Sequence, residues 1–298
     1  MSRIVAIGEC MVEMASKDAD TYRMGFAGDT MNTAWYLRRL LDQADTVEYF
    51  TAVGTDALSD RMVTFLQDAG LETDHILRRP DVSVGLYTIQ LQEGERSFSY
   101  WRGQSAARSL AQDERALISV LTHADMAYFS GITLAILPEN DRNTLLQVLA
   151  DFRKKGAKVI FDPNLRPKLW EDEETMRRVV MEAASVSDMV LPSHEDEALW
   201  FGDADPAATA ARYADHGSSW VIVKNGAGQI LAWENGNLSL HDPVAVSEVI
   251  DTTAAGDSFN AGFIASWITG ASVAGAIQSG AGLAAQVVQS RGALVNLR

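Results

Sequence analysis

The stretch MAYFSGITLAILPENDRNTLLQVLADFRKKGAKVIFD, residues Met126–Asp162, decides the fold class. Its two ends, Met126–Ser130 and Lys158–Asp162, are short apolar runs without polar alternation, which is typical of strands buried on both faces. Between them, Asp141–Lys155 repeats apolar residues at helical spacing and ends before Gly156. A strand, a helix and a strand in this order predict two parallel strands joined by a covering helix.

The same alternation continues on both sides of this stretch. Further strands are predicted at Ile4–Ile7, Val47–Val53, Met189–Leu191 and Trp220–Lys224, and further helices at Asn32–Leu41, Ser59–Ala69, Glu173–Ala184, Asp257–Thr269 and Ser272–Gln289. We therefore expect an α/β protein with a mostly parallel central sheet covered by helices on both faces. Gly85–Trp101 departs from this pattern, because residue types alternate around Glu93-Gly94-Glu95, and we expect a hairpin that covers a ligand site.

Length and composition restrict the function further. The chain has 298 residues, 47% of them hydrophobic, and no linker or repeat divides it, so residues 1–298 are expected to form one domain. A net charge of −15 makes non-specific nucleic-acid binding improbable. The single cysteine, Cys10, excludes an internal disulfide. No window reaches the roughly 20 apolar residues of a membrane span, so we expect a cytoplasmic protein without membrane contact.

Val249–Asn260, VIDTTAAGDSFN, carries the most chemical information. Small residues lead into an amphipathic helix, whose free N–H groups and dipole would form an anion site. Asp257 at the mouth of that site could accept a proton from a hydroxyl that attacks phosphorus. We expect nearby amide dipoles to keep Asp257 ionised at neutral pH. The alternative interpretation is that Asp257 only caps the helix.

The string Asp251-Thr-Thr-Ala-Ala-Gly-Asp257 resembles the C-terminal signature of the ribokinase-like (PfkB) carbohydrate kinases. The resemblance implies that Asp257 is the catalytic base, and that an anion hole for the transferred phosphate is formed by Ala254, Ala255 and Gly256. Ala254 stands where the family usually has glycine, which would cost energy if the backbone there needs a positive φ.

A second segment, Ala27–Ala34, resembles the family's sugar-binding turn and implies substrate contacts from Gly28, Asp29, Thr30, Met31 and Asn32. Three later segments resemble the family's nucleotide-side motifs. They imply ATP contacts from Asn164, Arg166, Ser193, Lys224, Gly226, Gly256 and Asn260. Glu197 matches the glutamate that organises Mg²⁺ through water, although His194 stands where asparagine is usual. The implied fold is a three-layer α/β/α domain with a β lid formed by about residues 10–26 and 82–103.

Within the family, several segments are similar to kinases of sugar acids. They imply that the substrate is contacted by Tyr87, Tyr100, Trp101, Arg102 and Arg166. Arginine holds a carboxylate with two parallel hydrogen bonds, which a neutral sugar would not require. The implied reaction is ATP-dependent phosphorylation of 2-keto-3-deoxygluconate to its 6-phosphate. Because ATP and the acid are both anions, we expect Arg102, Arg166 and Lys224 to converge on one positive cleft.

Alternatives remain open at this point. A kinase of 2-keto-3-deoxygalactonate, of fructose or of a nucleoside would share most of these motifs. A catalytically idle sugar-acid sensor on the same fold is a further alternative, which the intact Gly256-Asp257 pair argues against. The exposed side of the predicted lid also suggests a homo-oligomer, a dimer through the β lid.

Overall fold

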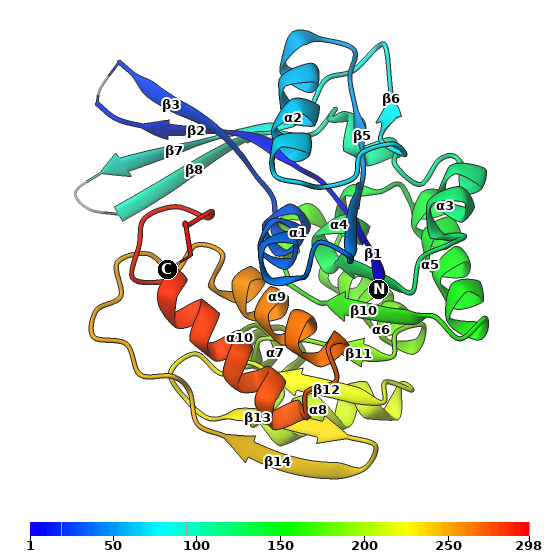
Figure 1. Cartoon of the computed structure of the whole chain (residues 1–298), viewed down its shortest axis with the longest axis vertical. Coiled ribbons are helices and arrows are strands. Elements are labelled where there is room, and N and C mark those ends of the chain that lie inside the picture. Colours follow the sequence, from blue (N-terminus) through cyan, green and yellow to red (C-terminus); the bar gives the residue numbers. More distant parts are fainter. Residues whose placement is uncertain (19, 93–94, 298) are drawn as a thin grey trace.

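A computed structural model describes residues 1–18, 20–92 and 95–297. Figure 1 shows a large central sheet with helices on both of its faces and a separate group of long strands that projects from one side. The strand order of the large sheet is β14-β13-β12-β11-β10-β9-β1-β4. The strands from β12 to β4 run parallel, and β13 and β14 are antiparallel to their neighbours. The predicted α/β class is therefore confirmed.

The bounds of the elements are as follows. The strands of the large sheet are β1 (Arg3–Ile7), β4 (Thr46–Phe50), β9 (Met126–Ser130), β10 (Lys158–Asp162), β11 (Met189–Val190), β12 (Trp220–Val223), β13 (Ile230–Glu234) and β14 (Asn237–His241). The helices are α1 (Asp29–Leu40), α2 (Ala57–Asp68), α3 (Glu114–Leu121), α4 (Gly131–Ile136), α5 (Glu139–Lys154), α6 (Glu173–Ser185), α7 (His194–Phe201), α8 (Pro206–Asp215), α9 (Ala255–Ile268) and α10 (Val273–Val287), with short 3₁₀ turns at Ala106–Ser109 and Pro167–Leu169.

Alternate residues of each central strand point to opposite faces of the sheet. In β9, Tyr128 packs in the core shared with α1, α9 and α10, whereas its neighbours Ala127 and Phe129 pack in the core shared with α3, α5 and α6. All three residues are fully buried. This explains why the strand sequences lack polar alternation: both faces lie in an apolar core, and only the strand ends reach solvent.

The projecting strands form a second sheet of order β3-β2-β7-β8. β2 (Met11–Ser16) pairs with β3 (Tyr22–Ala27) and with β7 (Leu86–Gln92), which pairs in turn with β8 (Glu95–Trp101). The two segments predicted to form a lid thus lie in one sheet, which we call the lid sheet. The residues at the predicted turn, Glu93 and Gly94, lie outside the described residues. The lid function itself stays a prediction.

Some element bounds differ from the prediction for identifiable reasons. The predicted strand Val47–Val53 is two strands, because Thr51 separates β4 from β5 (Ala52–Val53), which pairs with β6 (Leu77–Arg78) in a small sheet of its own. α1 begins at Asp29, three residues before the predicted start, since the glycine-rich turn is already its N-terminus. The antiparallel pair β13–β14 was not predicted as strands at all.

Candidate active site

The polar residues of the site follow the carboxyl ends of the parallel strands. Glu9 comes two residues after β1, Asp162 is the last residue of β10, and Lys224 follows β12 directly. In a parallel sheet these ends meet at one edge, where ligands of open α/β folds bind. The N-termini of α1 and α9 reach the same edge and supply Asp29 and Asp257.

A direct hydrogen bond joins the N-terminal and C-terminal signatures. Nδ2 of Asn32 donates to Oδ2 of Asp257 at 2.8 Å, across 225 residues of sequence. Asp29, one turn earlier in α1, accepts from Nδ2 of Asn164 at 2.8 Å. The predicted sugar-binding turn, the predicted base and the loop after β10 are therefore brought together.

A second group lies beside the first. Nζ of Lys224 is 3.1 Å from Oδ1 of Asn260 and 3.5 Å from Oδ2 of Asp162. Nδ2 of Asn260 donates to the same Asp162 oxygen at 2.7 Å. The Lys224 ammonium also borders the start of α9, because a Cβ added at Gly256 would lie 3.6 Å from Nζ. A cation and a helix N-terminus thus meet at one point, a combination that favours an anion.

The protonation of Asp257 differs from the prediction. Burial, followed by the neighbouring negative charge of Asp29, raises the pKa of this carboxyl to about 8. The hydrogen bond from Asn32 acts in the opposite direction but does not compensate. The expectation that Asp257 is ionised at neutral pH is therefore wrong for the unliganded chain: desolvation and like charge outweigh the amide dipoles.

The turn before α9 is strained, as the sequence suggested. Ala254 has φ 58° and ψ 17°, a left-handed conformation that favours glycine. The N–H of Ala255 donates to the carbonyl of Thr252 at 3.2 Å, so this amide does not face a ligand. Of the three residues predicted to form the anion hole, Gly256 provides the N–H in the first turn of α9, alongside that of Asp257.

Some residues of the predicted sugar-binding turn face the cleft, and others are buried in the core. Gly28 is required by close approach, since a Cβ there would lie 2.1 Å from the carbonyl oxygen of Glu9. Asp29 and Asn32 bond to cleft residues, as described above. Thr30 and Met31 are fully buried, and the Thr30 hydroxyl bonds to Tyr49 at 3.1 Å while Met31 packs in the apolar core. The last two are therefore structural in this arrangement, because a helix presents only some of its residues to one face.

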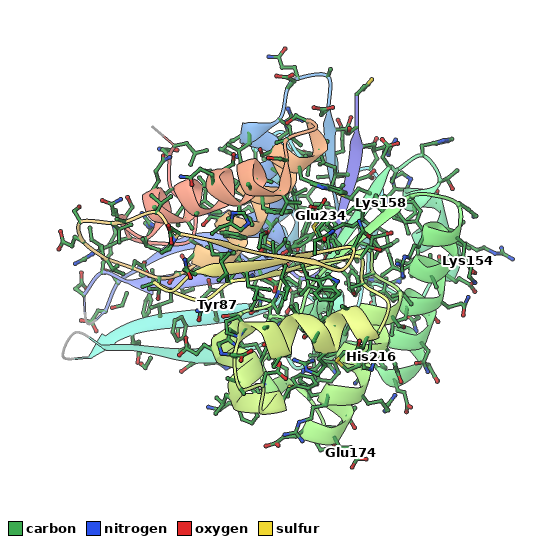
Figure 2. All side chains as sticks on the ribbon, turned by 90° about the horizontal axis from the view of Figure 1, so that it is seen from below. Tyr87, Lys154, Lys158, Glu174, His216 and Glu234 are labelled. Atoms are coloured by element: carbon green, nitrogen blue, oxygen red, sulfur yellow. The ribbon has the colours of Figure 1, made fainter. Side chains whose placement is uncertain are left out.

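The predicted sugar-acid residues lie in and beside the lid sheet. Figure 2 shows Tyr87 at the root of the β7–β8 hairpin, far from Lys154. Its ring stacks on Tyr100 at 5.7 Å, and its hydroxyl donates to Glu13. Tyr100 and Trp101 are exposed. Tyr87, Tyr100 and Phe98 stack on one face of the lid sheet, whereas Trp101, the next residue of β8, points to the opposite face.

Arg102 follows β8, and its side chain is 11% exposed. Its Nη2 bonds to the carboxylate of Glu9, which also accepts from the hydroxyl of Ser105. Burial raises the pKa of Glu9, and the Arg102 charge opposes that rise. Among the described residues, nothing pairs with Nε of Arg102, although this atom is buried. This guanidinium donor is therefore unsatisfied within the described chain.

The predicted positive cleft is not present as such. Each of the three cations has a carboxylate partner: Arg102 has Glu9, Lys224 has Asp162 at 3.5 Å, and Arg166 has Asp196 at 3.6 Å. The Arg166 side chain is half exposed in the loop after β10. These acids come from three different places, the loop after β1, the end of β10 and the helix α7, so the pairing could not be predicted from the sequence.

The remaining nucleotide-side predictions have mixed outcomes. Ser193 begins α7, forms a backbone bridge with Lys224 and so lies beside the cleft, and Gly226 is exposed with φ 54°. Glu197 is fully buried, and its two oxygens bond to Arg212 at 2.7 Å and Tyr213 at 2.9 Å. No oxygen of Glu197 faces the cleft, so its predicted Mg²⁺ role has no support in this arrangement.

Three residues of the site were missed by sequence reasoning: Glu9, Asp162 and Tyr128. Asp162 is the last residue of a predicted strand and Glu9 comes two residues after another, and these positions alone could have marked them. Tyr128 lies inside a strand and carried no such signal.

Among the described residues, no group of His, Cys, Asp and Glu could hold a metal ion by itself. Over the same residues, no helix has the length and apolar character needed to cross a membrane.

This fold and this site define a class of enzyme: an α/β phosphotransferase in which an aspartate lies beside an anion-binding helix start. The comparisons agree with this class. All residues, 1–298, match the family described as pfkB family carbohydrate kinase. The 2-dehydro-3-deoxygluconokinase of Escherichia coli K12 is 40% identical over 98% of this chain and 97% of its own length. That of Haemophilus influenzae is 38% identical over 99% and 96%.

The solved structures give the same result for the fold. A fructokinase from Xylella fastidiosa with bound ATP superimposes with a TM-score of 0.86 at 22% identity, covering 98% of this chain and 93% of that one. The chain belongs to the pfkB family of carbohydrate kinases, and its fold is the ribokinase-like fold.

The strain at Ala254 gives a stability prediction. The left-handed conformation costs an alanine about 1–2 kcal/mol, a cost that glycine avoids. Glycine also makes the unfolded chain more flexible, which cancels up to about 1 kcal/mol of this gain in stability. We expect Ala254→Gly to raise the free energy of unfolding by about 0.5–1 kcal/mol. The measurement is the urea midpoint. Ala255→Gly, the matched control one residue later, lies at a helical position and should not stabilise. A lower midpoint for Ala254→Gly would contradict the assignment of strain.

Proposed function

We propose that this chain transfers the γ-phosphoryl group of ATP to the terminal hydroxyl of 2-keto-3-deoxygluconate (2-dehydro-3-deoxy-D-gluconate), giving the 6-phosphate. Identities of 38–40% to two 2-dehydro-3-deoxygluconokinases, over nearly the full length of both partners, support this substrate. The single observation that carries the chemistry is the position of Asp257. Asp257 lies in the first turn of α9, next to the Lys224 ammonium, and its carboxylate is fixed by a hydrogen bond from Asn32 of α1.

The residues of the chain have separate tasks in this reaction. Asp257 accepts the proton of the substrate hydroxyl as that oxygen attacks phosphorus. Asn32 holds the carboxylate, and Asp29 lies beside it to bind a second hydroxyl. The N–H groups of Gly256 and Asp257, together with Lys224, stabilise the charge on the transferred phosphoryl oxygens. The lid sheet excludes water, which would otherwise compete as acceptor.

ATP and Mg²⁺ fit the residues that are present. Lys224 and the start of α9 provide a cation and backbone donors where phosphates would lie. Since the described residues hold no metal-binding group of acids, we propose that Mg²⁺ arrives with the nucleotide and is held by phosphates and water. When bound, the ion would neutralise phosphate charge. A cytoplasmic location, where ATP is supplied, is part of the same proposal.

Acid specificity is proposed to reside in Arg102. Its side chain keeps 11% of its surface exposed, and a substrate carboxylate that reached the guanidinium and displaced its covering would satisfy the unpaired Nε. Tyr87 and Tyr100, stacked on the lid sheet, would cover the sugar chain, and Arg166 lies on the nucleotide side.

The first test concerns the base. We expect Asp257→Asn to lower kcat by about 10²–10⁴-fold, the usual contribution of general-base catalysis, with KM for the acid little changed. In the wild type, kcat/KM should rise with pH through about 8 rather than near 4, because Asp257 must lose its proton first. Coupled ADP-release assays from pH 5.5 to 9.5 measure both effects. Near-normal turnover of Asp257→Asn would exclude Asp257 as the base.

The second test concerns the substrate carboxylate. Loss of a charge-assisted hydrogen bond is worth about 1.5–3 kcal/mol, so Arg102→Ala should raise KM for 2-keto-3-deoxygluconate by about 10–100-fold. The control is Arg178→Ala, which removes the same charge from an exposed pair with Glu182 on α6. Parallel assays with 2-keto-3-deoxygalactonate and fructose separate the related substrates. An unchanged KM for the acid would contradict the carboxylate contact.

A dimer through the lid sheet is also proposed. Phe98, Tyr100 and Trp101 on β8, the last strand of that sheet, are 44%, 54% and 61% exposed. Exposed aromatic side chains on an edge strand favour contact with a second copy of the sheet. We expect sedimentation velocity to give twice the mass of one chain for the wild type. The double variant Tyr100→Ser/Trp101→Ser should sediment as a monomer. A monomeric wild type at micromolar concentration would contradict the dimer.

A further inference from the structure

A buried hydroxyl behind the cleft has no part in the mechanism above. Tyr128 lies in the middle of β9, on the face that packs against α1 and α9, and its side chain is fully buried. Two other fully buried polar side chains contact its hydroxyl: Thr33 of α1 and Asn260 of α9. The oxygen of Tyr128 therefore lies where the central strand meets the two helices that carry Asp29, Asn32 and Asp257.

The direction of these hydrogen bonds follows from the donors available. Nδ2 of Asn260 donates to the Tyr128 hydroxyl at 3.1 Å, since an amide nitrogen only donates. Oγ1 of Thr33 lies 3.2 Å from three oxygens: the Tyr128 hydroxyl and the main-chain carbonyls of Asp29 and Asp257. Carbonyls only accept, and Thr33 has one proton. Thr33 donates to the Tyr128 hydroxyl, and both carbonyls lie at the same distance from its oxygen, so this one hydroxyl links β9, α1 and α9.

We propose that Tyr128 is a positioning residue for phosphoryl transfer: through Thr33 it holds the main chain of Asp257 at a fixed place relative to Asp29. This inference rests on the proposed function. The hydroxyl touches no reacting group and acts through a relay from β9 to α1 to α9. Since Asn32 on α1 also holds the Asp257 carboxylate, the relative placement of the two helices sets the direction of that carboxylate.

Small displacements matter in such a site. A shift of about 1 Å at the reacting atoms can cost about 100-fold in rate, whereas binding contacts spread over the rest of the ligand tolerate it. A positioning residue should therefore affect kcat more than KM. Removal of the Tyr128 oxygen leaves Asn260 bonded to Asp162 at 2.7 Å, so the Lys224 side of the cleft is retained.

The experiment compares Tyr128→Phe with Tyr49→Phe in the full chain. Tyr49 on β4 is equally buried, and its hydroxyl bonds to Thr30 of the same helix α1 at 3.1 Å, but it does not reach α9. Both variants lose one buried hydroxyl. We expect Tyr128→Phe to lower kcat about 10-fold with KM for ATP and for the acid within about 3-fold, and Tyr49→Phe to keep kcat within about 2-fold.

Thr33→Val and the double variant test the relay itself. If Tyr128 acts through Thr33, Thr33→Val lowers kcat by a similar factor, and Tyr128→Phe/Thr33→Val is no slower than the slower single variant. Unchanged kcat in Tyr128→Phe, an equal loss in Tyr49→Phe, or multiplicative losses in the double variant would each overturn the inference. If the wild-type chain released no ADP with the acid and ATP, the proposed function would be contradicted, and this inference with it.

Discussion

The hydrogen bond between Asn32 and Asp257 is the interaction on which the site depends. It joins the first turn of α1 to the first turn of α9, so residues at opposite ends of the chain define one carboxylate direction. The parallel sheet makes this contact possible, because it delivers both helices to the edge at which its strands end. Any change that moves α1 relative to α9 therefore changes the direction of the Asp257 carboxylate, even where the rest of the fold is retained.

The same geometry concentrates negative charge. Asp29, Asp162 and Asp257 lie close enough that each raises the energy of another's ionised form, and Lys224 is the cation beside them. The consequence for folding follows from linkage. A native carboxyl with a pKa of about 8 binds a proton that the unfolded chain releases near pH 4. Its contribution to stability is therefore lost progressively as pH rises from about 4 to about 8, and the loss is complete where the base becomes active.

Much of this arrangement could be predicted from the sequence, for physical reasons. Strands buried on both faces leave continuous apolar runs, and β10 was located residue for residue at Lys158–Asp162. The sequence marked Ala254 as a place where strain would arise if the backbone needed a positive φ, and the backbone there does have φ 58°. What the sequence could not provide was pairing in space. That Arg102 bonds to Glu9, or that Glu197 turns inward to Arg212 and Tyr213, depends on which elements become neighbours.

The pairing of Arg102 also explains how a chain of net charge −15 can select an acid. A patch of uncompensated cations would attract any anion, including nucleotides and free phosphate. Glu9 neutralises Arg102 and fixes its orientation, while Nε remains without a partner among the described residues. In the proposed complex, the substrate carboxylate would meet a directed donor rather than a positive field. Directed donors in buried positions discriminate strongly, because a ligand that lacks the matching acceptor leaves the donor unsatisfied. Selection for a carboxylate is therefore compatible with an acidic surface, provided that the recognition is local.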